Sequence, residues 1–357
     1  MFAESFEKIS SRKNELVRRT FSLFQEQKAK KEQVMILEGL RLVETALLAG
    51  LPEWLFLADD ARGENSLKRL RPSLEKASVK DPDKLSEASY AEASLQQEAK
   101  VQAADWSERV RLVESSLFDA LARTENSQGV LAVFHHPAYS PLPAQFPASS
   151  RLILLERIAD PGNLGTIIRT VEALGFDGLI FLGEHVSPYN AKTLRASMGS
   201  ALFLKLYEAI HLAEVKKHLQ ETRLYTADMS GIPLLDLLTC PRAAEQKQAL
   251  DQCEAEVQEN IPVKCSAQAG VRQRTTEHNS SLRYGEKDCP VSGRNLNPCG
   301  FALLLGNEAH GVSEEAKALC DCLISVEMQG EAESLNLAAA AAILSWGLSA
   351  AHGFLGE

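Results

Sequence analysis

The stretch LERIADPGNLGTIIRT, residues 155–170, joins two local patterns that together indicate an α/β fold. It follows an apolar run over Leu152–Leu155 that suits a strand buried on both faces of a parallel sheet. The DPGN turn at 160–163 comes next, and apolar residues then recur at helical spacing from Leu164. We therefore predict a helix that begins near Leu164 with Asn163 as its cap. In an open α/β sheet, this places Asn163 at the carboxyl ends of the strands, where ligands bind.

Arg169 follows Asn163 by six positions, which is less than two helical turns. Its long side chain could therefore reach back toward the same sheet edge. Taken alone, however, a simple helix cap and a surface arginine explain this pair better than a binding site does.

A second stretch, LLGNEAHGVS at 304–313, leaves another apolar strand through a loop bounded by two glycines, Gly306 and Gly311. No Lys-Ser or Lys-Thr follows, so the pattern of a phosphate-binding loop is not met. The loop offers backbone N–H groups and the carboxylate of Glu308, which suit a purine edge or a ribose. A plain glycine turn fits about equally well, but it leaves Glu308 beside an apolar strand unexplained.

A third stretch, ISVEMQGEAESLNL at 324–337, again runs from a strand through a glycine loop to a helix. The helix is expected over Leu337–Ala351, with Ser334 as its N-cap, and capping is the simpler explanation for Ser334 alone. Asn336 is then inside the first turn of an apolar helix. That position is unusual, because Asn prefers caps and turns.

The rest of the chain extends the α/β rhythm over two predicted domains, residues 1–134 and 151–357, joined by a proline-rich linker at 135–150. Helical patterns alternate with apolar runs, and one expected helix is Leu40–Ala49. In the first domain we expect strands at Val34–Gly39, Trp54–Leu57 and Gln128–Phe134. In the second we expect strands at Leu152–Leu155, Leu179–Leu182, Leu224–Ala227, Phe301–Leu305 and Leu323–Val326.

The segment between about Cys240 and Gly300 breaks this rhythm, because it is polar and lacks sustained periodicity beyond a possible helix at Arg242–Gln258. We interpret it as an insertion or a disordered loop within the second domain. It holds five cysteines: Cys240, Cys253, Cys265, Cys289 and Cys299. Their spacing matches no metal-ligand pattern, so no metal site is predicted.

Composition limits the classes of function. The formal net charge of −10 counts against a nucleic-acid partner, although a basic arm over Lys8–Lys31 offers cations that could contact phosphate or form a solvated helix face. An odd number of cysteines, seven, without a C-x-x-C pair favours reduced thiols and a cytoplasmic location. We expect neither a transmembrane helix nor a secretory signal, since no apolar run is long enough for the first and the N-terminus carries acids.

Taken together and in this order, the three stretches resemble the three motifs of the SpoU (TrmH-like) family of SPOUT RNA methyltransferases. The segment Tyr189–Ser200 and the N-terminal stretches Glu38–Glu44 and Ser127–Ala132 are also similar to that family. No G-x-G-x-x-G follows the first strand of either domain, so the commoner Rossmann-like architecture for S-adenosylmethionine (SAM) is not supported. The resemblance covers nearly the whole chain except the segment 240–300.

The resemblance implies an enzyme that transfers the SAM methyl group to a ribose 2′-hydroxyl of a structured RNA, with ribosomal RNA favoured. It implies a small ribosomal-protein-like α/β domain that binds RNA, a knotted parallel-sheet α/β domain, and a homodimer that completes its active site across the interface. SAM would contact Gly306, Val326 and Leu335. The implied catalytic residues are Asn163, Arg169, Glu308, Ser334 and Asn336.

Two alternatives remain open from the sequence, a transfer RNA substrate and a non-catalytic RNA-binding assembly factor of the same fold. The role of Arg169 is open as well. The family's proposals make this arginine the base, but a guanidinium does not ordinarily lose its proton in proteins. Arg169 could instead bind a phosphate and orient the hydroxyl while water takes the proton.

Overall fold

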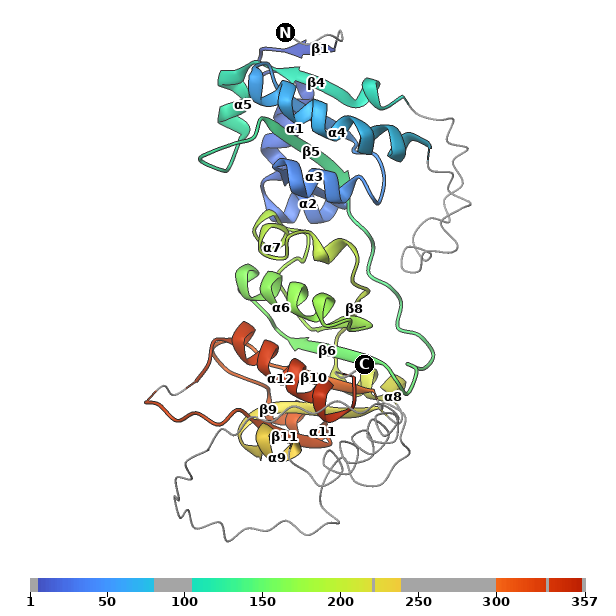
Figure 1. Cartoon of the computed structure of the whole chain (residues 1–357), viewed down its shortest axis with the longest axis vertical. Coiled ribbons are helices and arrows are strands. Elements are labelled where there is room, and N and C mark those ends of the chain that lie inside the picture. Colours follow the sequence, from blue (N-terminus) through green and yellow to red (C-terminus); the bar gives the residue numbers. More distant parts are fainter. Residues whose placement is uncertain (1–5, 80–104, 220–221, 239–299, 332–333, 355–357) are drawn as a thin grey trace, which may run out of the picture.

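Two β-sheets, one after the other along the chain, form the framework of the molecule (Figure 1). The computed structural model describes residues 6–79, 105–219, 222–238, 300–331 and 334–354. The predicted segment between Cys240 and Gly300, with its five cysteines and possible helix, lies outside the described residues except for Gly300 itself. Among the described residues, no helix is long and apolar enough to cross a bilayer.

The first sheet has five strands in the order β1-β4-β3-β5-β2, of which β5 is antiparallel to both of its neighbours. The three predicted strands and the predicted helix are present, with small changes at their ends. β1 and β4 were not predicted, and both are only three or four residues long. The elements are β1 (Glu7–Ile9), α1 (Glu15–Leu23), α2 (Glu26–Glu32), β2 (Val34–Glu38), α3 (Leu40–Ala46), β3 (Trp54–Ala58), α4 (Ala61–Val79), η2 (Trp106–Arg109), β4 (Val110–Val113), α5 (Ser115–Leu121) and β5 (Val130–His135).

The second sheet has six parallel strands in the order β11-β9-β10-β6-β7-β8. All five predicted strands are confirmed, and β8 is an additional one. The elements are β6 (Arg151–Glu156), α6 (Pro161–Ala173), β7 (Gly178–Leu182), α7 (Ala191–Ala196), η3 (Ser200–Leu202), β8 (Leu206–Ala209), α8 (Leu212–Leu219), β9 (Arg223–Pro233), α9 (Leu234–Leu238), β10 (Phe301–Leu305), α11 (Glu314–Leu319), β11 (Cys322–Ser325) and α12 (Leu337–Ala351).

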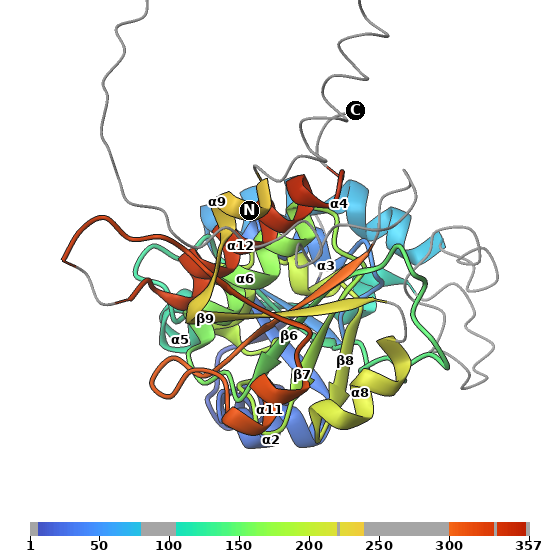
Figure 2. The ribbon, with the colours of Figure 1, turned by 90° about the horizontal axis from the view of Figure 1, so that it is seen from below.

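Helices cover both faces of the second sheet, as Figure 2 shows from below. Buried residues of α6, α9 and α12 join one apolar cluster, and those of α8 and α11 join another on the opposite face. The central strands β6 and β10 therefore consist mainly of buried apolar residues, as predicted. Because all six strands are parallel, the loops that leave β6, β10 and β11 emerge at the same edge.

Two helix caps differ from the prediction. Helix α6 begins at Pro161, and its N-cap is Asp160 rather than Asn163, because the Asp160 carboxylate accepts a hydrogen bond from the Asn163 N–H. Helix α12 begins after Asn336, whose side chain accepts from the N–H groups of Ala338 and Ala339. Asn336 is therefore the cap that we had assigned to Ser334.

The predicted linker connects the two sheets and packs against the second one. Ser140 forms a parallel bridge with Tyr207 of β8, and its N–H donates to Leu206 O at 2.7 Å. The ring of His136 stacks on Tyr189 at 4.4 Å. Helix α7 packs against β2 of the first sheet. One apolar cluster includes residues of both sheets, so the two sheets share a continuous core.

Part of the basic arm has a structural role. Lys8 pairs with Asp59, and Arg19 pairs with both Glu32 and Glu53. The Arg19 guanidinium also lies over the ring of Trp54. These contacts do not test whether the arm also binds phosphate, so that stays a prediction.

Candidate active site

Three loops meet at the carboxyl edge of the second sheet, and the carboxylate of Glu308 joins two of them. Glu308 lies in the loop after β10. Its Oε1 accepts from the N–H of Asp160 at 3.1 Å and from Nδ2 of Asn163 at 3.4 Å, and its Oε2 accepts from the N–H of Ala159 at 3.5 Å. These groups belong to the loop after β6 and the first turn of α6. Glu308 therefore holds that turn against its own loop.

Asn163 connects this pair of loops to the third. Its Oδ1 accepts from Nδ2 of Asn336 at 3.0 Å, while the Asn336 Oδ1 caps α12. Both ends of the Asn163 amide are thus engaged, one by Glu308 and one by Asn336. Three residues that the sequence had singled out separately form one hydrogen-bonded chain, which we call the Glu308–Asn163–Asn336 chain.

The loop after β10 is closed on itself at Gly306. The N–H of Asn307 donates to Gly311 O at 3.0 Å, and the N–H of Gly311 donates to Asn307 O at 2.8 Å. A Cβ on Gly306 would lie 2.0 Å from the carbonyl carbon of Gly311, so only glycine fits without a shift of backbone. This close approach explains why the turn needs glycine at position 306, and it leaves the predicted contact of Gly306 with SAM a prediction.

Further hydrogen bonds fix this loop at both ends. The Asn307 Nδ2 donates to Arg157 O at 2.9 Å. The Glu156 carboxylate, at the end of β6, accepts from the N–H and the hydroxyl of Ser313 at 2.9 and 2.8 Å. Sequence reasoning missed Asp160, Asn307, Glu156 and Ser313. Asp160 precedes a proline and a glycine, which is the pattern of a cap before a first-turn proline and could have identified it.

The remaining predicted site residues lie around this chain without joining it. Val326 follows β11 and is half-buried, and Ser334 and Leu335 are exposed on the approach to α12. Arg169 is exposed on α6 and lines a hollow of about 520 Å³ with Ala342 and Trp346 of α12. The structure thus brings Asn163, Glu308 and Asn336 together, and it places Arg169 on the face that α6 shares with α12.

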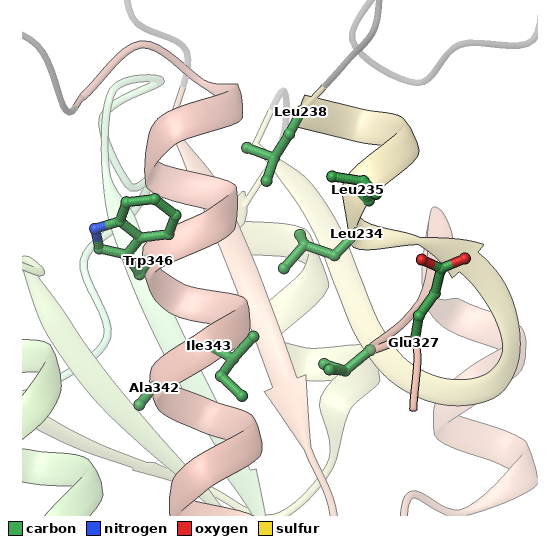
Figure 3. A pocket seen from close by; sticks show the side chains of 8 residues that line it. Leu234, Leu235, Leu238, Glu327, Ala342, Ile343 and Trp346 are labelled. Atoms are coloured by element: carbon green, nitrogen blue, oxygen red, sulfur yellow. The ribbon is translucent and has the colours of Figure 1, made fainter. Parts of the chain in front are cut away.

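Helix α12 also borders a second open hollow, of about 510 Å³, between itself and α9. Figure 3 shows Leu234 and Leu238 of α9 facing Ile343 and Trp346 of α12, with Glu327 at the rim. Trp346 is 54% exposed and borders both hollows. The exposed face of α12 is therefore apolar and is hollowed on both sides.

The electrostatics of the site depend on short-range contacts. The hydrogen bond from the Asn163 N–H is the largest single cause that lowers the pKa of Asp160, and Lys192 acts in the same direction. Asp160 is therefore ionised at neutral pH, as an N-cap carboxylate should be. Among the described residues, no cluster of His, Cys, Asp or Glu could hold a metal ion.

Comparison with protein families gives a match to the model of the SpoU rRNA methylase family over residues 150–250 and 242–346. Among curated relatives, the chain is 28% identical over 237 residues to the 23S rRNA (guanosine(2553)-2′-O)-methyltransferase RlmP of Bacillus subtilis, covering 66% of this chain and 71% of that protein. It is 31% identical over 193 residues to the 23S rRNA (uridine(2479)-2′-O)-methyltransferase of Streptomyces viridochromogenes, covering 54% and 50%.

Solved structures show the same fold over almost the whole chain. An AdoMet-bound rRNA methyltransferase from Sinorhizobium meliloti matches with a TM-score of 0.63 and 20% identity, covering 99% of both chains. The SpoU methyltransferase AviRb of Streptomyces viridochromogenes, in complex with AdoMet, matches with a TM-score of 0.60 and 19% identity, covering 97% of this chain and all of that one.

Proposed function

Because the chain belongs to the SpoU rRNA methylase family, we propose that it is a SAM-dependent enzyme that methylates a ribose 2′-hydroxyl of ribosomal RNA. The Glu308–Asn163–Asn336 chain is the observation that carries this proposal, since it joins all three motifs at the ligand-binding edge of the sheet. Two relatives are named as 23S rRNA 2′-O-methyltransferases, and this favours ribosomal over transfer RNA.

The loops after β10 and β11 fit SAM. The closed turn leaves no room for a Cβ on Gly306, so this residue can present only its backbone to a ligand. We assign cofactor contacts to Gly306, Val326 and Leu335, largely through backbone groups. When bound, SAM supplies a methyl carbon that is electrophilic because its sulfur is positively charged.

The protein's task is then to align the hydroxyl and assist the loss of its proton. Asn163 is held at both ends of its amide, yet its Nδ2 keeps a second hydrogen and its Oδ1 a second lone pair for a ribose. We therefore assign Asn163 and Asn336 to orienting the ribose, and Glu308 to holding Asn163. Ser334, which is exposed beside Asn336, adds a hydroxyl donor and acceptor.

We propose that Arg169 acts at a boundary between two subunits of a homodimer. It lies with Trp346 on the face of α6 and α12, about two helical turns from Asn163. Exposed Ile343 and Trp346, with Leu235 on α9, make this face apolar. In this arrangement, Arg169 binds a phosphate of the substrate and orients the hydroxyl, because a guanidinium is a cation that donates hydrogen bonds and is not a base in proteins.

Three further predictions stay proposals. The knot is supported by the fold shared with SpoU methyltransferase structures. The division into an RNA-binding domain at 1–134, a linker at 135–150 and a methyltransferase domain at 151–357 is supported by the two sheets. A cytoplasmic location is supported by the odd number of cysteines without a C-x-x-C pair.

Two measurements test the proposed function. Calorimetry with SAM should show binding to the purified protein, and transfer of labelled methyl from SAM to ribosomal RNA should be measurable. The ribosomal RNA should come from cells that lack this protein, so that the target site is unmodified. If the protein binds SAM but methylates no RNA, the non-catalytic assembly factor is favoured. If it methylates tRNA and not ribosomal RNA, the alternative of a tRNA methyltransferase is favoured.

A further inference from the structure

One lysine outside the three motifs lies beside the Glu308–Asn163–Asn336 chain. Lys192 is in the first turn of α7, which Asn190 caps. Its Nζ lies 3.5 Å from Oδ2 of Asp160, and its Cε lies 3.9 Å from the position that a Cβ on Gly162 would occupy. The Lys192 side chain therefore extends over the first turn of α6, beside Asp160 and Gly162.

The contact with Asp160 does not account for Lys192. Asp160 already accepts a hydrogen bond of 2.7 Å from the Asn163 N–H, and this bond is the largest single cause that lowers its pKa. The side chains of Lys192 and Asp160 are 63% and 45% exposed. A long and exposed ion pair of this kind contributes little to stability. The ammonium can therefore turn to an anion that arrives from solvent.

The backbone of Lys192, in contrast, is fixed relative to the site. Helices α6 and α7 are in close contact at Gly165, where a Cβ would lie 2.5 Å from the Cβ of Ala196 and 2.7 Å from the carbonyl oxygen of Thr193. The Asn190 side chain holds the start of α7 by accepting from the Thr193 N–H at 2.8 Å. A fixed backbone with an exposed ammonium suits a residue that positions a ligand.

We propose that Lys192 is a positioning residue whose ammonium binds a backbone phosphate of the RNA next to the target ribose. This inference rests on the proposed function. The carboxylates of Asp160 and Glu308 lie beside Asn163, and they repel the phosphates on either side of a ribose that binds there. A cation at Lys192 offsets this repulsion and attracts the RNA backbone.

The test compares Lys192→Ala and Lys192→Arg with Lys217→Ala, which removes an exposed lysine from the last turn of α8. The probe is ribosomal RNA from cells that lack this protein, with binding measured at several salt concentrations. For Lys192→Ala we expect about fivefold to tenfold weaker binding and a salt slope smaller by about 0.7, because one phosphate contact is lost. KM for RNA should rise more than kcat falls. Lys192→Arg and Lys217→Ala should behave like the wild type.

Two results would overturn this inference: an unchanged affinity for RNA, or a weaker affinity with an unchanged salt slope, which would indicate a structural role. SAM calorimetry on Lys192→Ala reports whether the fold is intact, and Lys192→Gln replaces it if the alanine variant does not fold. A wild-type protein that methylates no ribosomal RNA would contradict the proposed function instead. The salt slope still tests the phosphate contact in that case, because it needs no methyl transfer.

Discussion

Glu308 shows how a single carboxylate can be recognised in a sequence while its partners cannot. Its place in a glycine loop after an apolar strand marked it as a candidate, and the resemblance gave it a role. Its partner Asn163 is 145 residues away, and the Asn163–Asn336 pair is separated by 173. No local pattern relates positions so far apart, because the parallel sheet brings them together only when its strands are in register.

At the same scale, Arg169→Ala should reduce methyl transfer to ribosomal RNA at least about 100-fold, because an oriented cation at the reacting group is lost. The SAM dissociation constant should stay within about twofold, since Arg169 is assigned to the RNA and not to the cofactor. Arg169→Lys keeps the charge without the planar fork and should recover only part of the activity. A large loss of SAM affinity in Arg169→Ala, measured by calorimetry, would place Arg169 in the cofactor site.

At the scale of elements, the longer buried strands were predicted, the short strands β1, β4 and β8 were not, and two helix caps were assigned to the wrong residue. Apolar runs identify buried strands directly, and β10 was predicted with its observed bounds. A helix cap depends on the backbone conformation of one residue. Where several residues that can cap a helix lie close together, the sequence does not show which of them has that conformation. Asp160 and Asn163 compete in this way before α6, as do Ser334 and Asn336 before α12.

The cap of α12 provides a prediction with a matched control. Asn336→Ala removes the cap, which costs about 1 kcal/mol of folding stability, and it also releases Asn163. Asn14→Ala removes the equivalent cap of α1, where Asn14 accepts from the N–H groups of Leu16 and Val17. Both variants should lower the free energy of unfolding similarly in urea titrations, but only Asn336→Ala should lose methyl transfer. Equal methyl-transfer activities in the two variants would show that Asn336 acts only as a helix cap.

An ion pair that titrates in acid joins strand β9 to helix α11. Lys317 donates to Asp228 at 2.7 Å, and this contact, ahead of Ser230, lowers the pKa of Asp228 to about 2. An Asp with a depressed folded pKa stabilises the protein above its unfolded pKa of about 4, and it loses that effect as pH falls toward 2. Asp228→Asn should therefore cost about 2 kcal/mol at pH 7 and flatten the loss of stability between pH 4 and 2. If the free energy of unfolding falls equally in the variant and the wild type between pH 4 and 2, the assignment to Asp228 is wrong.

At the scale of the whole molecule, the exposed apolar face on α12 is the feature that packing within one chain does not explain. The pattern at 337–351 predicted a helix correctly, but its alanine-rich apolar sequence does not reveal which side faces another subunit. The structure shows which side of α12 is exposed, because Ile343 and Trp346 are exposed while Leu344 and Leu348 are buried. In the proposed dimer, this exposed side faces the other subunit. Arg169 lies on the same side. Assembly and catalysis would therefore depend on one surface.

Trp346→Glu tests this dependence, because a carboxylate in the centre of the face must be desolvated for two copies to associate. We expect a dimer for the wild type and a monomer for the variant in sedimentation velocity, with methyl transfer reduced at least about tenfold as Arg169 loses its boundary position. Ile210→Glu is the control, since Ile210 is 73% exposed and follows β8 at the far edge of the sheet from β11. That variant should remain dimeric and active. A monomeric Trp346→Glu protein with full activity would separate the dimer from catalysis, and it would require each subunit to hold a complete site in which Arg169 reaches Asn163 within its own chain.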